Sequence, residues 1–284
     1  MESRLARLLI KGGTVITLLF LYVPIVILAL YAFSKGVARR WPPELWTTRW
    51  FTAAWDDPDL RRAIVGSLQA AAGATIVALF LGSLAAFAVH RFRFFGRQTI
   101  SFVLVLPIAL PGIVTAMALG SAVDFGNRLF GLEFGIWPII IAHATFCVVV
   151  VFNNVVARLR RTSTSFVEAS MDLGADGWQT FRHITWPALR TAIVAGALLA
   201  FGLSFDEIVV TNFVAGPKLT LPLWIFSNIR QPRQQPMVNA VALVIMVASV
   251  IPVYLAQRLT GGVEEARRSG TRQERLVPDG TGAG

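Results

Sequence analysis

Long apolar stretches separated by short polar segments dominate this chain. Six of them, 21 to 27 residues long, are almost free of charged side chains: residues 12–33, 64–89, 100–123, 135–157, 188–214 and 237–257. The hydrocarbon core of a bilayer, about 30 Å thick, is crossed by roughly 20 residues of helix. Backbone polar groups in lipid must be paired within their own segment. The pattern therefore predicts an all-α polytopic membrane protein with about six transmembrane helices.

The amino-acid composition excludes several other classes of protein. Of 284 residues, 55% are hydrophobic and 15% are charged, with a mean hydropathy of +0.63. Soluble domains carry about 25% charged residues, so an ordinary soluble enzyme and a disordered chain are excluded. Cys147 is the one cysteine, which excludes an internal disulfide and a cysteine metal cluster. We attribute the net charge of +10 to membrane-surface loops and lipid headgroups, not to nucleic acid.

The spans divide the chain into three parts. Residues 1–11 form an N-terminal segment, residues 12–257 a transmembrane domain that includes the polar loop 158–187, and residues 258–284 a polar tail predicted to be disordered. The first span has a basic flank like that of a signal peptide, but its apolar run is too long, so we interpret it as a retained anchor. Lys and Arg densities are nearly equal on the two sides, so charge alone leaves the orientation open.

Small residues recur at every fourth position in two spans. The series are Ala70, Ala74, Ala78, Gly82 and Ala86 in the second span, and Ala188, Ala192, Gly196, Ala200 and Ser204 in the fifth. Positions four apart share one helix face, and such smooth faces favour close helix packing in membranes. The alternative is an alanine-rich composition without a packing role. In the third span, Pro107, Pro111 and Gly112 predict a kinked helix that lines a pathway.

The loop after the fourth span carries helix-boundary signals. Ser165 and Glu168 have the spacing of a capping box, and Gly174 is placed to end the short helix that follows. Asp176 is a candidate cap for a second short helix, and Pro187 suits the first turn of the fifth span. The short helix displays an apolar ridge that we predict to be a docking surface. The ridge residues are Phe166, Val167, Met171 and Leu173.

The same loop resembles the EAA loop of permease subunits of ABC-type importers. Its order is Glu-Ala-Ser-x3-Gly-x9-Ile-x-Trp-Pro, starting at Glu168. Five positions match the family pattern, whereas Ser170 and Trp186 depart from it. The resemblance implies a cytoplasmic coupling helix that sits in a cleft of a separate ATPase subunit. The residues implied in coupling are Phe166, Val167, Glu168, Ala169, Ser170, Met171, Leu173 and Gly174.

The resemblance extends over nearly the whole chain, towards the spermidine/putrescine-type permeases. It is carried by residues 91–97 (RFRFFGR), 106–112 (LPIALPG), 143–147 (HATFC), 203–207 (LSFDE) and 219–222 (LTLP). It implies a polyamine substrate, with an opine, a phosphonate or ferric iron as alternatives.

The implied partners are a homologous permease subunit, two ATP-binding subunits, an extracytoplasmic substrate-binding protein and membrane lipid. The implied location is the bacterial inner membrane, with both termini cytoplasmic. The chain has no G-x-x-x-x-G-K-[ST] phosphate loop, so we expect a non-enzymatic subunit without a cofactor of its own. ATP and Mg²⁺ belong to the partner ATPase.

Four residues are candidates for the substrate pathway: Asp206, Glu207, His143 and Trp224. The two carboxylates lie in the outer half of the fifth predicted span, where they either attract a cationic substrate or pair with a basic residue of an outer loop. His143 is either a pathway group or a residue hydrogen-bonded to a neighbour. Trp224 is either an interfacial anchor or part of a cation site. A transporter driven by an ion gradient, with a His143–Asp206 proton relay, is the alternative class.

Overall fold

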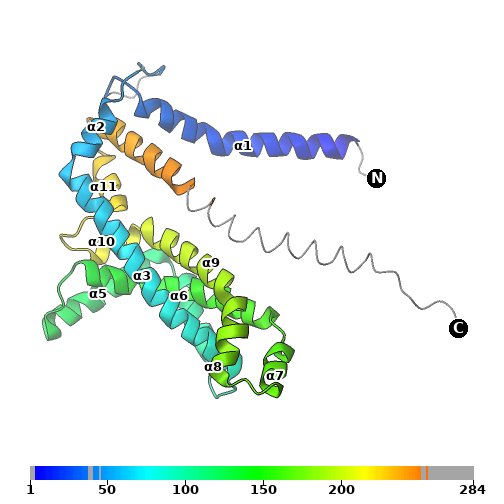
Figure 1. The fold of residues 1–284 in the computed structure, drawn as a ribbon. Coiled ribbons are helices and arrows are strands. Elements are labelled where there is room, and N and C mark those ends of the chain that lie inside the picture. Colours follow the sequence, from blue (N-terminus) through cyan, green and yellow to red (C-terminus); the bar gives the residue numbers. More distant parts are fainter. Residues whose placement is uncertain (1–3, 38–40, 45, 251–253, 255–284) are drawn as a thin grey trace. The chain divides into compact units, whose positions relative to one another are not determined.

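The computed structural model describes residues 4–37, 41–44, 46–250 and 254, and this part of the chain is built from helices (Figure 1). The predicted all-α class is confirmed. Four helices are long and apolar enough to cross a membrane: Ala6–Ala32, Pro58–Arg91, Ile136–Arg161 and Gly177–Phe205. They correspond to the first, second, fourth and fifth predicted spans.

The helices have the following bounds. They are α1 (Arg4–Ala32), α2 (Arg49–Asp56), α3 (Pro58–Arg91), α4 (Arg97–Ala109), α5 (Gly112–Phe130), α6 (Ile136–Arg161), α7 (Thr164–Asp172), α8 (Gly177–Thr180), the π-helical turn η1 (Phe181–Thr185), α9 (Trp186–Phe205), α10 (Val209–Val214) and α11 (Leu221–Asn228). A further apolar helix runs over Gln235–Val250 and covers much of the sixth predicted span. Residues 251–253 and 255–257 of that span, and the whole predicted tail 258–284, lie outside the described residues.

The third predicted span is two helices and not one kinked helix. α4 ends at Ala109 and α5 begins at Gly112. Leu110 between them is extended, with φ −81° and ψ 146°, as a residue before a proline prefers. Pro111 then has no N–H with which to continue the ladder of α4. The chain therefore breaks at Pro111, whereas α4 runs through Pro107.

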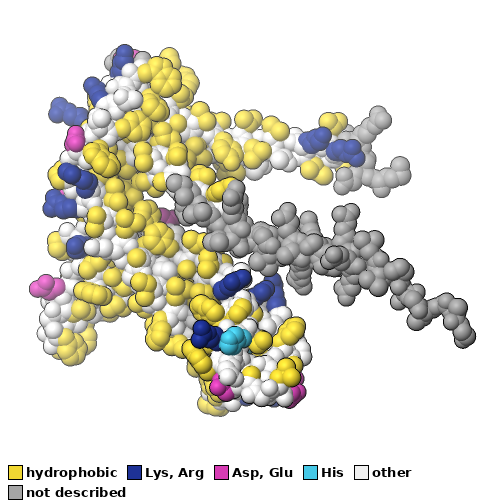
Figure 2. Space-filling view, viewed as in Figure 1, with side chains coloured by type: hydrophobic (Ala, Val, Ile, Leu, Met, Phe, Trp, Pro, Cys, Tyr) yellow, Lys and Arg dark blue, Asp and Glu magenta, His cyan; other side chains and the backbone are white. Residues whose placement is uncertain are grey.

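The helices fall into two compact units. The first contains the chain up to Ile64 together with Leu221–Ser249, and the second contains Val65–Thr220. In the first unit, α1 exposes apolar side chains along its length, including Phe20 at 79%. Figure 2 shows hydrophobic side chains over much of the visible surface of both units. Such an apolar surface suits contact with lipid or with another membrane subunit.

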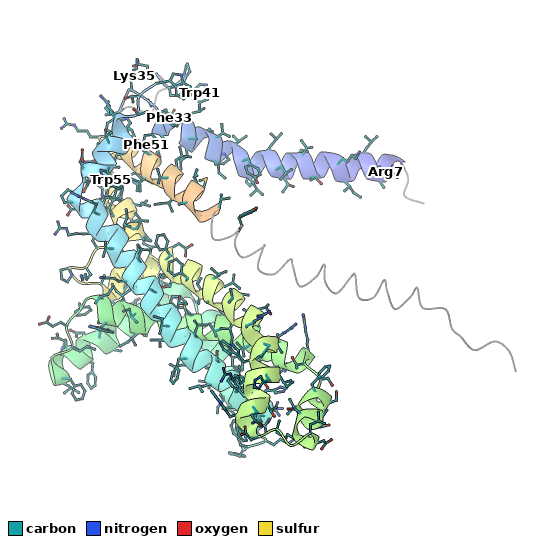
Figure 3. The ribbon with its side chains drawn as sticks, viewed as in Figure 1. Arg7, Phe33, Lys35, Trp41, Phe51 and Trp55 are labelled. Atoms are coloured by element: carbon teal, nitrogen blue, oxygen red, sulfur yellow. The ribbon has the colours of Figure 1, made fainter. Side chains whose placement is uncertain are left out.

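Within the first unit, aromatic side chains tie the end of α1 to α2. The Phe33 ring lies 5.1 Å from that of Phe51, and the Trp50 indole N–H donates to the Ser34 carbonyl at 2.8 Å. Figure 3 shows Phe33, Phe51 and Trp55 at this corner, with Arg7 at the opposite end of α1. These contacts fix the turn that follows the first span.

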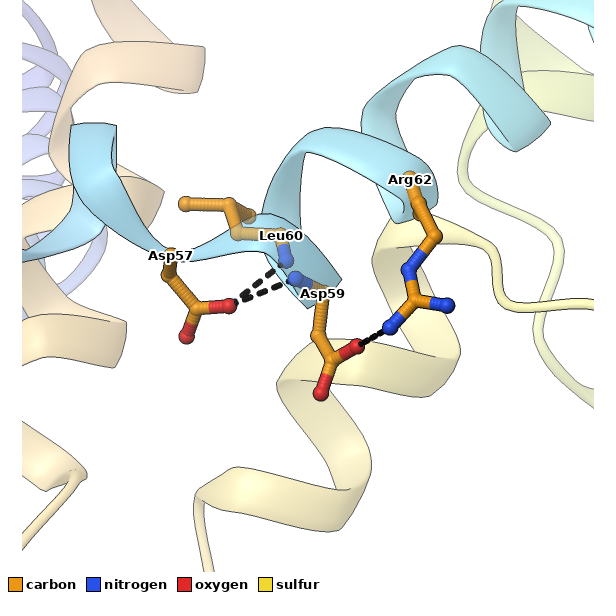
Figure 4. Close-up of polar contacts among 4 residues, drawn as sticks. All are labelled: Asp57, Asp59, Leu60 and Arg62. Atoms are coloured by element: carbon orange, nitrogen blue, oxygen red, sulfur yellow. Dashed lines mark hydrogen bonds and ion pairs between the residues drawn. The ribbon is translucent and has the colours of Figure 1, made fainter.

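A capped junction connects α2 to α3. One Asp57 carboxylate oxygen accepts the backbone N–H groups of Asp59 and Leu60 at 2.8 and 3.0 Å, and Asp59 pairs with Arg62 (Figure 4). The first N–H groups of a helix have no partner inside it, so a side-chain cap is needed at this point. Asp57 therefore sets where the second span begins.

In the second unit, α6 lies between α3 and α9. At Gly82 of α3, an added Cβ would lie 2.9 Å from the Val148 carbonyl oxygen, and at Gly196 of α9 it would lie 3.4 Å from the Val151 Cα. The second-span stripe is buried, since Ala74, Ala78 and Ala86 have no exposed surface. Both predicted stripes thus contain residues that let a backbone approach α6.

Helices α6 and α9 run antiparallel with a regular register. His143 contacts Ser204, and one turn further along α6 the Cys147 thiol donates to the Ala200 carbonyl at 3.3 Å. At the other end of the pair, the Arg158 guanidinium donates to the Ala188 carbonyl at 2.7 Å. Ser204, Ala200 and Ala188 all belong to the small-residue stripe of α9, so this stripe faces α6.

Candidate functional site

The loop between α6 and α9 contains the predicted short helix, α7, but its cap differs from the prediction. Ser163, and not Ser165, is the N-cap, and its hydroxyl oxygen accepts the Ser165 N–H at 3.3 Å. The predicted Ser165–Glu168 capping box is therefore wrong. Glu168 is exposed, and its carboxylate accepts no hydrogen bond from the described residues. It remains available to another molecule.

The end of α7 matches the prediction. Gly174 has φ +84°, the left-handed conformation that favours glycine. The Gly174 N–H donates to the Met171 carbonyl at 2.9 Å, and the Ala175 N–H donates to the Ser170 carbonyl at 3.1 Å. These two bonds form a Schellman motif, which satisfies the last carbonyls of the helix and turns the chain sharply.

Replacing Gly174 with alanine is expected to destabilise the turn that ends α7, whereas Gly174→Asn retains most of its stability. A Cβ at this position meets open space, so the cost is conformational: about 1–2 kcal/mol for an ordinary residue in the left-handed region, which asparagine tolerates better. The Tm of the detergent-solubilised protein measures the effect. Gly177→Ala is the matched control, because its Cβ also meets open space and it has no positive φ. Equal effects at the two glycines would contradict this explanation.

The predicted apolar ridge of α7 is divided between two surfaces. Phe166 and Leu173 are 63% and 89% exposed. Val167 and Met171 instead line a groove of about 760 Å³, whose other walls include Phe87 of α3 and Leu159 of α6. Hence Phe166 and Leu173 form the outward apolar surface, which we call the outer face of α7.

Behind α7, the loop is joined to the transmembrane helices. The Ser170 and Thr180 hydroxyls are 3.1 Å apart, and Asp176 and Gln179 form a reciprocal capping box at α8. The predicted role of Asp176 is confirmed. The Phe181 ring lies 5.9 Å from Phe87 and 5.7 Å from Trp178. The loop thus has side-chain contacts with α3 and continues directly into α9.

Pro187 lies in the first turn of α9, as predicted, but the helix does not begin there. α8, η1 and α9 form one continuous helix, Gly177–Phe205, with a π-helical turn just before the proline. Pro187 lacks the N–H of a regular helix and its ring crowds the preceding turn, and a π turn accommodates both. The last part of the loop, from Gly177 onwards, and the fifth predicted span as far as Phe205 are therefore one helix of 29 residues.

The fifth predicted span is broken at its two carboxylates. α9 ends at Phe205, Asp206 is its C-cap, and α10 begins at Val209. A Glu207 carboxylate oxygen accepts the Val210 N–H at 3.0 Å, so Glu207 caps α10. The prediction of one helix through both residues is wrong, because the side chain of Glu207 satisfies the start of a new helix.

Asp206 differs from its neighbour. Its side chain is exposed, and among the described residues it accepts no hydrogen bond from another residue and forms no ion pair. A basic partner from an outer loop, the alternative to a pathway role, is absent from this part of the chain. A charged side chain inside a membrane span is costly unless it faces water or a ligand. The break therefore presents one uncompensated carboxylate.

His143 is buried at 1% exposure, and both ring nitrogens are hydrogen-bonded. Nδ1 lies 2.8 Å from the Ser204 hydroxyl and Nε2 lies 2.9 Å from the Thr211 hydroxyl. The prediction that His143 bonds to a polar neighbour is confirmed. The His143–Asp206 relay finds no support, since both nitrogens already have other partners.

Trp224 is buried at 2% exposure in α11. It is therefore not an interfacial anchor, and its ring is not open to a cation in this structure. Its position in the sequence, beside a span boundary, gave no sign of this burial. Its place in the candidate pathway is not supported.

Sequence reasoning missed three residues that shape these sites. Ser163 caps α7, Phe181 packs the loop on α3, and Thr211 bonds to His143. Ser163 was visible as a serine just before the helix, but two serines in three positions left the cap ambiguous. Thr211 and Phe181 had no sequence signal, because their partners are more than 60 residues away in the chain.

A family model supplies the decisive comparison. The model described as "Binding-protein-dependent transport system inner membrane component" matches residues 78–263, which include α7, the Gly177–Phe205 helix and Asp206. This chain belongs to that family. The Escherichia coli (strain K12) putrescine transport system permease protein PotI is 36% identical over 253 residues, 87% of this chain and 89% of the relative. The spermidine/putrescine permease PotC of the same strain is 35% identical, covering 88% and 93%.

More distant relatives agree on the architecture. The putative 2-aminoethylphosphonate permease PhnV of Salmonella typhi is 29% identical over 76% of this chain and 81% of the relative. A chain from a bacterial ABC transporter that imports alginate superposes with a TM-score of 0.70, at 17% identity, covering 92% of this chain and 99% of that one. A second structure of an alginate transporter, bound to a periplasmic protein, gives a TM-score of 0.67 at 17% identity, covering 91% and 94%. These two structures confirm the fold of an importer permease.

Proposed function

We propose that this chain is the permease subunit of an ABC importer that carries a polyamine, such as spermidine or putrescine, across the bacterial inner membrane. Two relatives with 35% and 36% identity over nearly the whole chain are named as permeases for these compounds. Polyamines are flexible cations, and a cation in a low-dielectric pathway requires a fixed negative charge. The uncompensated Asp206 carboxylate at the α9–α10 break is the observation that carries this proposal.

The coupling residues have a distinct role in the proposal. α7 would dock by its outer face in a cleft of an ATP-binding subunit. The loop would then lie in the cytoplasm, and with six spans both termini would lie there too. Exposed Glu168 and Ala169, half-buried Ser170 and the Gly174 turn would complete this contact. Two ATP-binding subunits would hold ATP and Mg²⁺, so this chain would need no cofactor and would have no ATPase site of its own. A homologous permease subunit and an extracytoplasmic binding protein would complete the transporter.

The continuous Gly177–Phe205 helix supplies a mechanism. At 1.5 Å per residue, 29 residues span about 43 Å. One end is bonded to α7 through Ser170 and Thr180, and the other ends at Asp206. A displacement of α7 when the ATP-binding subunits close would tilt this rod and move the carboxylate relative to α6. Transport would thus be coupled to ATP hydrolysis without a covalent step in this chain.

A second substrate class has a specific relative in its favour. The named substrate of PhnV, 2-aminoethylphosphonate, carries an ammonium group that Asp206 could also meet, together with an anionic phosphonate. A pathway for that compound would need a basic group near Asp206. No described Lys or Arg pairs with Asp206. This favours a polycation, and opines and ferric iron have no comparable observation.

Replacing Asp206 with asparagine is expected to reduce spermidine uptake by about tenfold or more, because a fixed charge facing a cation is lost. The measurement is uptake of labelled spermidine into proteoliposomes that contain the whole transporter and saturating binding protein. Glu133→Gln is the matched control, since Glu133 is an exposed carboxylate in the loop before α6. Normal uptake by the Asp206 variant would show that the Asp206 carboxylate has no role in the substrate pathway. If 2-aminoethylphosphonate stimulates ATP turnover and polyamines do not, the substrate is an aminophosphonate and not a polyamine.

A further inference from the structure

A chain of buried hydrogen bonds crosses the α9–α10 break. Ser204 lies in the last turn of α9 and Thr211 in the first turn of α10, and His143 of α6 lies between them. These three side chains are at most 2% exposed. Buried polar groups are retained where every partner is satisfied, and this network meets that condition.

The donors and acceptors of the network can be assigned. The Thr211 hydroxyl donates its only hydrogen to the Glu207 carbonyl at 2.7 Å. It must therefore accept from His143, which places the imidazole hydrogen on Nε2. Nδ1 is then an acceptor for the Ser204 O–H. The bonds run in one direction, from the end of α9 through the ring of His143 to the backbone of the break.

The last of these bonds reaches the residue beside Asp206. The Glu207 carbonyl is held by Thr211, and the Glu207 carboxylate is held by the N–H of Val210. Both ends of Glu207 are thus fixed, whereas the Asp206 side chain has no partner among the described residues. The position of Asp206 depends on Glu207 and on the last turn of α9. His143 is bonded to Ser204 in that last turn, and through Thr211 it is connected to the Glu207 carbonyl.

We propose that His143 is a positioning residue for the Asp206 carboxylate. This inference rests on the proposed pathway role of Asp206. The ring does not meet the substrate: it holds the two helix ends in one arrangement and so sets where the free carboxylate lies. Its neutral, singly protonated form suits this role, because it offers one donor and one acceptor to the two hydroxyls.

The first test needs no substrate and so is independent of the proposed function. Cys147 is the one cysteine and is buried, and Cys147→Ser keeps a donor for the Ala200 carbonyl. In that background, Asp206→Cys reports the position of residue 206 through its rate of reaction with a cationic thiol reagent in proteoliposomes. Adding His143→Phe, which keeps a ring but removes both hydrogen bonds, is expected to change this rate about tenfold.

Two control variants distinguish a change in the position of residue 206 from a general disturbance of the fold. A Ser165→Cys reporter on exposed α7 should react at the same rate with either residue at position 143. Thr211→Val should reproduce the change at position 206, since it removes the bond to the Glu207 carbonyl. An unchanged rate at position 206 would overturn the proposal. Equal changes at both reporters would also overturn it, because they would indicate a structural role alone.

The second test asks whether His143 acts through Asp206. His143→Phe is expected to lower spermidine uptake in the wild-type chain but to have no further effect in an Asp206→Asn chain. Additive losses would overturn the positioning role. If Asp206→Asn alone leaves uptake unchanged, the proposed pathway role fails, and the thiol-reaction rates still decide whether His143 sets the position of residue 206.

Discussion

Replacing Gly82 with alanine is expected to destabilise the permease by about 1–3 kcal/mol, because the site has no room for a Cβ. The added atom would lie 2.9 Å from the Val148 carbonyl oxygen and 3.0 Å from the Val151 Cβ. It would also lie 3.1 Å from the backbone nitrogen of Phe152. Two of these three neighbours are backbone atoms of α6, which cannot rotate away. The added atom would therefore push α3 away from α6.

Thermal unfolding of the detergent-solubilised protein measures this effect. Gly202→Ala is the matched control, since Gly202 also lies in a membrane-spanning helix but has no atom within 4 Å of the added Cβ. Alanine is a better helix former by about 1 kcal/mol, so this variant should have an unchanged or higher Tm. Gly82→Ala should therefore lower the Tm, whereas Gly202→Ala should not. A Gly82 variant as stable as Gly202→Ala would show that α3 and α6 do not pack as described.

Replacing Phe166 with glutamate is expected to abolish ATP-driven uptake and the association with the ATP-binding subunit. Phe166 lies on the outer face of α7 and is 63% exposed, where an apolar ring has no stabilising role in this chain. Burying a phenylalanine in a partner contributes about 1.5–3 kcal/mol, and a carboxylate left in the same pocket adds a desolvation cost. The association constant should therefore fall by more than about tenfold.

Co-purification of the ATP-binding subunit and uptake in vesicles are the two measurements. Ser165→Glu is the control on the same helix: it adds the same charge at an exposed position of the first turn, where an acidic residue suits the helix dipole. The control should bind and transport normally. If Phe166→Glu retains both activities, the outer face of α7 is not the coupling surface.

The loop between α6 and α9 contains features that the local sequence pattern could predict. The short helix, its end at Gly174 and the cap at Asp176 were all predicted, because each depends on residues within a few positions along the chain. The N-cap was misplaced by two residues. Ser163 and Ser165 are chemically alike. Which of them becomes the N-cap depends on where α6 ends, and the local sequence pattern does not contain that information.

The fifth span illustrates the opposite case. Asp206 and Glu207 are adjacent and both acidic, so sequence treats them as equivalent. The structure assigns Glu207 to the start of α10 and leaves Asp206 free, because Thr211 and His143 fix the backbone between them. His143 and Thr211 are 68 residues apart, a separation over which no periodic pattern carries information.

The length of the apolar stretches established the membrane class, because it reflects the solvent around each residue. The four-residue spacing of small side chains established the packing faces, and the glycine at the end of α7 established the end of the loop helix. Both of these signals reflect the nearest neighbours of a residue. The bonding of His143 and the arrangement of the break beside Asp206 depend instead on contacts between segments that are distant in the chain. A buried hydrogen bond is satisfied by whichever group the fold brings near, and that choice is made in three dimensions.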